Sequence, residues 1–93
     1  MNSKNVTIYR IKKAATRYFN VSDKPYNEAS TAQKKYMDEG GEYRSPYWKR
    51  LETIKNNAVN TGMEYQALLE DLGLYDSVKA ELTKLRSSKN KNI

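Results

Sequence analysis

Residues 40–50 hold both a helix stop and a helix start, and the rest of the chain is arranged around them. Gly40 and Gly41 cost too much backbone entropy to lie inside a helix, so the preceding segment has to end there. Ser45 followed by Pro46 has the pattern of an N-cap with proline in the first helical position. The sequence therefore predicts one helix that ends near Glu39 and another that begins at Pro46.

Apolar residues recur at helical spacing along most of the chain, and no strand pattern, internal repeat or sustained heptad competes with them. We therefore expect an all-α fold: one small domain, residues 1–93, of four to five short helices with an ordered core from about 6 to 86. Turn residues and caps predict the breaks between helices at Asn20–Lys24, Gly40–Ser45, Asn60–Thr61 and Gly73–Tyr75.

The last two helices are predicted to form a C-terminal helical hairpin with Gly73 at its turn. We expect Leu68, Leu72 and Leu82 to supply most of its buried aliphatic surface. The spacing is similar to that of a helix-turn-helix, but acidic residues near the start of the second helix would face phosphates badly. An ordinary helical hairpin accounts for the same residues. The polar residues 87–93 are predicted to form a disordered tail.

The composition predicts a thin core and a basic surface. Leu, Ile, Val and Phe make up only 16 of the 93 residues, and eight tyrosines compensate in part. The formal net charge is +6, and all of it belongs to residues 1–60, where 12 Lys or Arg oppose six Asp or Glu. The short, lysine- and asparagine-rich chain is typical of phage or mobile-element products. A segregated positive charge favours a polyanionic or acidic partner.

Several classes of function have little support in the sequence. Histidine and cysteine, the usual general bases and nucleophiles, are both absent, so we expect no enzymatic activity, no cofactor and no metal. The acidic residues Asp38, Glu39 and Glu42 flank a glycine pair, which is the pattern of a solvated loop. No segment resembles a signal peptide or a membrane span, so a cytoplasmic location is expected.

Two groups of basic residues are candidates for binding nucleic acid. On the first helix the cations recur at i, i+3 and i+7, and no acidic residue occurs among residues 1–20. At the 40–50 corner, aromatic and basic side chains alternate, as in proteins that stack unpaired bases while holding the backbone. The candidate residues are Arg10, Lys13, Arg17, Tyr43, Arg44, Lys49 and Arg50.

Each group also has an ordinary structural interpretation. A line of cations on a helix is commonly a solvated face, and a thin core would favour burying Tyr47 and Trp48. The function we favour is a small, basic, non-enzymatic protein that binds nucleic acid. The alternative is a protein–protein interaction module, of the kind phages use as inhibitors or adaptors, that docks its Tyr- and Arg-rich surface on an acidic partner.

Overall fold

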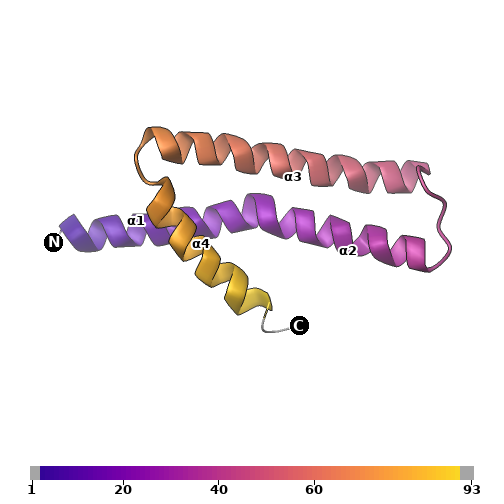
Figure 1. Cartoon of the computed structure of the whole chain (residues 1–93), viewed down its shortest axis with the longest axis horizontal. Helices are drawn as coiled ribbons and strands as arrows, with labels where there is room; N and C mark the ends of the chain where they lie inside the picture. The colour runs from indigo at the N-terminus through magenta and orange to yellow at the C-terminus, as the bar shows by residue number, and fades with distance from the viewer. Residues whose placement is uncertain (1–2, 91–93) are drawn as a thin grey trace.

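The computed structural model describes the backbone of residues 3–90 and the side chains of residues 7–88. Within these residues the fold is all-α and contains no strand, as predicted. Helix α1 (Ser3–Tyr18) leads through a π-helix, η1 (Phe19–Asp23), into α2 (Lys24–Asp38). Helices α3 (Pro46–Asp71) and α4 (Tyr75–Asn90) follow (Figure 1).

The predicted break at Asn20–Lys24 is wrong, because α1, η1 and α2 form one continuous helical rod. The backbone N–H of Lys24 bonds to the carbonyl of Phe19, five residues back, which is the π-helical pattern. In a regular α-helix the ring of Pro25 would press against the carbonyl of residue 21. The wider π turn lies immediately before this proline and lets the helix continue.

The break at Gly40–Ser45 is confirmed. Gly40 has a φ of +88°, a left-handed conformation that glycine adopts without steric cost. On the far side of the loop, the Ser45 hydroxyl accepts a hydrogen bond from the backbone N–H of Trp48 at 3.2 Å. Ser45 is therefore the N-cap of α3, with Pro46 in the first turn, as the sequence predicts.

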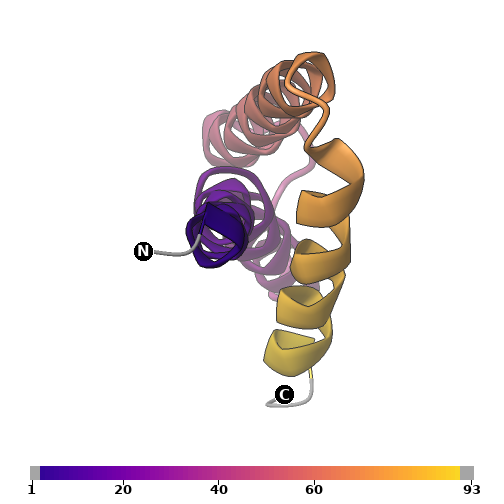
Figure 2. The same cartoon turned by 90° about the vertical axis from the view of Figure 1, so that its left-hand side faces the viewer.

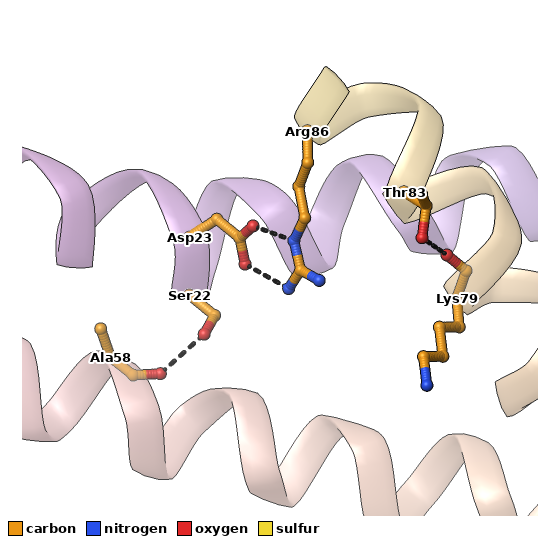
Figure 3. Close-up of polar contacts among 6 residues, drawn as sticks. All are labelled: Ser22, Asp23, Ala58, Lys79, Thr83 and Arg86. Atoms are coloured by element: carbon orange, nitrogen blue, oxygen red, sulfur yellow. Dashed lines mark hydrogen bonds and ion pairs between the residues drawn. The ribbon is translucent and has the colours of Figure 1, made fainter. Parts of the chain in front are cut away.

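The predicted break at Asn60–Thr61 is wrong, since α3 runs without interruption from Pro46 to Asp71. The α1–η1–α2 rod and α3 lie antiparallel (Figure 1). They approach closely where small residues face each other. The Ser22 hydroxyl donates a 2.9 Å hydrogen bond to the Ala58 carbonyl, drawn in Figure 3. A Cβ atom at Gly62 would lie 2.4 Å from that hydroxyl oxygen, so the glycine next to the predicted cap at Thr61 serves the helix contact.

Helix α4 begins after the turn at Gly73, whose φ of +71° confirms the predicted break. It does not run back along α3 as a hairpin. Instead it turns away from the end of α3 and crosses α1, as the two views agree (Figures 1 and 2). The chain therefore has fewer and longer helices than predicted. Helix α4 also continues to Asn90, so residues 87–90 are helical, and residues 91–93 of the predicted tail lie outside the described residues.

The main core lies where α4 crosses α1 and the end of α3. Ala15, Leu69, Val78 and Leu82 form its buried centre, at 0–3% exposure. The predicted burial of Leu82 is confirmed. The predicted burial of Leu68 and Leu72 is wrong, because their side chains are 53% and 62% exposed. At this end of α3 the buried leucine is Leu69, because α4 packs on the side of α3 that the predicted hairpin would have left open.

Candidate nucleic-acid interface

The cations of α1 form a line along its exposed surface, hereafter the α1 cation line: Arg10, Lys13 and Arg17. Helical periodicity places residues at i, i+3 and i+7 on one face, and here that face is turned away from the core. Together with Ala14 and with Tyr65 of α3, they line a groove of about 290 Å³ between the two helices. Tyr65 is held in place by an edge-to-face contact with Tyr18, with ring centroids 5.8 Å apart.

The three cations have no carboxylate partner among the described residues. The Lys13 ammonium lies 5.8 Å above the ring of Tyr9. Two cations of the C-terminal helix differ: Lys84 pairs with Glu81 at 3.3 Å, and Arg86 pairs with Asp23, while Lys79 lies over the ring of Tyr75. The α1 cation line therefore keeps a positive field that no neighbouring group in the described chain cancels.

The second candidate group lies at the loop between α2 and α3, where Tyr36 holds the backbone in place. Its hydroxyl accepts a hydrogen bond from the Glu42 N–H at 3.1 Å and shares another with the Ser45 hydroxyl at 2.7 Å. The ring lies so close to Gly41 that a Cβ atom there would come within 2.5 Å of it. The glycine is thus required by the close approach of an aromatic ring, as well as by the helix end.

The aromatic side chains of this loop pack on one another, and none of them belongs to the core. Tyr43 is 58% exposed, and its ring meets that of the half-buried Trp48 edge to face at 4.8 Å. The Arg44 guanidinium lies 5.4 Å above the Tyr43 ring. Tyr47 is 43% exposed and contacts Tyr36 edge to face. Tyr47 is therefore not in the core, contrary to that interpretation, and Trp48 is only half-buried, because both stand in the first turn of α3 at the end of the helix pair.

Lys49 and Arg50 are exposed on the first turn of α3 and have no ion-pair partner within the described part of the chain. With Arg44 they give the loop end its own positive charge. This end lies beyond the far end of α2, whereas the α1 cation line lies within α1, in a molecule 56 Å long (Figure 1). The structure therefore separates the predicted site residues into two groups, and a single ligand would need to run along the molecule to contact both.

Sequence reasoning missed a polar cluster between α2 and α3. Gln33 is 7% exposed; its side-chain nitrogen donates to Glu52 at 2.8 Å, and its oxygen accepts from Lys55 at 3.1 Å. Lys55 also lies over the ring of Tyr26. Gln33 stands in a weak apolar stripe, and nothing in its spacing indicates the network. Because Lys55 is satisfied inside this cluster, its charge is not available to a ligand.

Tyr65 is the other missed site residue: it packs against the core, as its apolar spacing indicates, and it also lines the α1–α3 groove. Among the described residues no group of three or more His, Cys, Asp or Glu is placed to hold a metal ion. No helix within residues 3–90 is both long and apolar enough to cross a membrane. Comparisons with protein-family models, curated proteins and solved structures returned no significant match.

Proposed function

We propose that this chain is a small, basic, non-enzymatic protein that binds nucleic acid through the α1 cation line. The observation that carries the proposal is the exposed, unpaired state of Arg10, Lys13 and Arg17 within the described structure. Phosphate contacts by such cations release condensed counterions, which gives affinity without sequence preference. The cations at the loop end, Arg44, Lys49 and Arg50, extend the contact when the ligand is long enough.

The length of the molecule sets the length of the probe. A duplex rises about 3.4 Å per base pair, so one lying along the 56 Å axis spans about 16 base pairs. Arg17 stands about 32 Å from the end of α2 at 1.5 Å per residue, so a probe of about 20 base pairs can contact both groups of cations, whereas one of about 5 base pairs can contact only one. A longer probe binds more tightly in any case, because it offers more positions at which the protein can bind. A gain in affinity with probe length that exceeds this statistical gain would support a ligand that runs along the molecule.

The test is the affinity for mixed-sequence duplex and single-stranded oligonucleotides at several salt concentrations. Log affinity should fall linearly with log salt, and the triple variant Arg10→Ala, Lys13→Ala, Arg17→Ala should reduce the slope by about three. A matched control removes the same charge elsewhere: Lys34→Ala, Lys79→Ala and Lys84→Ala, of which Lys34 and Lys84 are ion-paired and Lys79 lies over the ring of Tyr75. The control should change the slope far less. If the two triple variants reduced the slope equally, only the net charge would matter and the α1 cation line would not be the binding site. If no salt-dependent binding were seen at low salt, the proposal would be refuted.

A second candidate function is docking on an acidic protein, and the aromatic cluster at the loop end favours it. Tyr43, Trp48 and Arg44 already contact one another, so they offer a partly exposed surface of the residue types that dominate interface hot spots. Under this alternative, oligonucleotides would show no salt-dependent binding. Tyr43→Ala and Arg44→Ala would then weaken a protein complex in which the α1 cation line plays no part.

A further inference from the structure

The end of α3 exposes two leucines on one face. Tyr65, Leu68 and Leu72 stand at i, i+3 and i+7, which places them along one side of the helix. Leu68 and Leu72 are 53% and 62% exposed, whereas their neighbour Leu69 is 3% exposed. Both leucines thus remain exposed although α4, which crosses α1 (Figure 2), packs against Leu69 of the same helix.

Opposite charges flank this leucine pair. On one side the α1–α3 groove joins Tyr65 to the α1 cation line. The other side of the leucine pair is acidic. Successive residues of a helix are rotated by about 100°, so the residues met in turn round the axis of α3, starting from Tyr65, are Leu72, Leu68, Glu64 and Asp71. Glu64 and Asp71 are exposed and have no ion-pair partner among the described residues. Across this face the surface is therefore basic, then apolar, then acidic.

Such a surface is complementary to a copy of itself in one arrangement. A two-fold axis parallel to α3 reverses the order of the three stripes, so that each basic stripe faces an acidic one and the leucines meet in the middle. We propose that a second copy of this chain docks on the leucine face in this way, with the two α3 helices parallel. Leu68 and Leu72 then each lie opposite their own counterparts, and Glu64 and Asp71 face the α1 cation line of the other copy.

The proposal goes beyond nucleic-acid binding and has a consequence for it. The same three cations serve both contacts, so the dimer covers the α1 cation line and a nucleic acid competes with the second copy. A nucleic acid spread over the leucine face itself would meet two carboxylates and an apolar strip. The charges of that face fit another copy better than they fit a polyanion.

Single cysteines test the arrangement, because the chain has none of its own. Leu68→Cys and Leu72→Cys should each form a disulfide-linked dimer rapidly under mild oxidation, since a parallel axis places both residues opposite themselves. Met63→Cys is the matched control: Met63 is 62% exposed on the same helix but stands about 140° round it from Leu68. Cross-linking of Leu68→Cys and Leu72→Cys no faster than that of Met63→Cys would overturn the proposal.

Charge reversal gives a second test, read by sedimentation of the full chain. Two double variants are used: one combines Glu64→Lys with Asp71→Lys, and the other combines Arg10→Glu with Arg17→Glu. Each should be monomeric at concentrations where the unaltered chain dimerises. Mixed together they should form a heterodimer, because one now carries two basic stripes and the other two acidic stripes. An unaltered chain that stays monomeric up to high concentration, or a mixture that does not associate, would refute the dimer.

Leu68→Glu separates this proposal from the proposed function. It should abolish the dimer and leave oligonucleotide affinity equal or higher, because the α1 cation line is then uncovered. Cross-linking of Leu68→Cys without any oligonucleotide binding would retain the dimer and refute the nucleic-acid proposal. Oligonucleotide binding by a chain that never dimerises would retain the nucleic-acid proposal and refute the dimer.

Discussion

Arg86 of α4 forms a two-pronged ion pair with Asp23, the last residue of the π-helix, across 63 positions of sequence. Its Nη2 donates to Asp23 Oδ1 at 3.0 Å and its Nε donates to Asp23 Oδ2 (Figure 3). The hydrogen bonds to Asp23 raise the pKa of the Arg86 guanidinium. This pair joins the crossing helix to the place where the long rod departs from α-helical geometry.

Replacing Asp23 by Asn should therefore destabilise the fold modestly. The Arg86 side chain is 44% exposed, so water screens the pair, and we expect a loss of about 1 kcal/mol in the free energy of unfolding. Chemical denaturation measures it. Asp38→Asn is the matched control, because its partner Lys34 belongs to the same helix and both are exposed. A loss no larger than that of the control would mean that the pair does not hold α4 in place.

Neighbouring leucines of α3 should differ sharply in what they contribute. Leu69→Ala removes a side chain that is 3% exposed and packs against Val78 and Leu82, and it should cost about 2–5 kcal/mol. Leu68→Ala removes one that is 53% exposed and should cost about 0.5 kcal/mol or less in the monomer. Thermal and denaturant unfolding at low protein concentration compare the two. Equal costs would contradict the placement of the core.

Gly62→Ala should destabilise the protein although alanine favours helices by about 1 kcal/mol. The new Cβ would lie 2.4 Å from the Ser22 hydroxyl oxygen and 3.3 Å from that of Tyr18, so the rods must separate. We expect a net loss of about 1–3 kcal/mol, as in other overpacked sites. Asn60→Ala, at an exposed position of the same helix, is the control and should be neutral or stabilising.

Partial rescue would show that the hydroxyl is the obstacle. In the double variant Gly62→Ala, Ser22→Ala, the loss should be smaller than the sum of the two single losses, because the clashing oxygen is gone. Strictly additive losses would mean that Gly62 acts on the helix alone.

Stability should fall at alkaline pH in part through Tyr18. Burial, with a contribution from the nearby Tyr75, raises the pKa of Tyr18 above its ordinary value of 10.0. The folded state thus favours the neutral phenol, so this contribution is fully present below about pH 10 and is lost as pH rises through the raised pKa. Tyr18→Phe keeps the ring and should move the alkaline unfolding midpoint upward, as followed by circular dichroism. Tyr9→Phe, at an exposed position, should not.

Tyr43→Ala tests the stacking prediction at the loop end. The ring is 58% exposed and therefore free to stack on an unpaired base. We expect Tyr43→Ala to reduce the binding free energy for single strands by about 1–3 kcal/mol and to leave that for duplexes unchanged. Fluorescence anisotropy with both probes measures it. Met63→Ala, at a similarly exposed apolar residue, is the control. An equal loss on both probes would assign Tyr43 to the scaffold of the loop, through its contact with Trp48.

Local residue chemistry was sufficient to predict the all-α fold, the ends at Gly40–Ser45 and Gly73, and the alignment of Arg10, Lys13 and Arg17. Each of these depends on contacts within one or two helical turns, as the Ser45 cap and the left-handed glycines illustrate. The breaks at Asn20–Lys24 and Asn60–Thr61 failed for the opposite reason. Neither outcome follows from local residue chemistry: the π turn of η1 lets the helix continue into Pro25, and α3 passes through the predicted cap at Thr61, where Gly62 packs against Ser22 of η1.

Only the tertiary structure decided which side of α3 is buried and how far apart the two basic groups lie. Periodicity places Leu68, Leu69 and Leu72 at helical spacing but does not say from which side a second helix will come. Because α4 crosses α1 instead of returning along α3, Leu69 is buried and its neighbours remain in solvent. Because η1 joins α1 to α2 in one rod, the length of α2 separates the α1 cation line from the loop end, in a molecule 56 Å long.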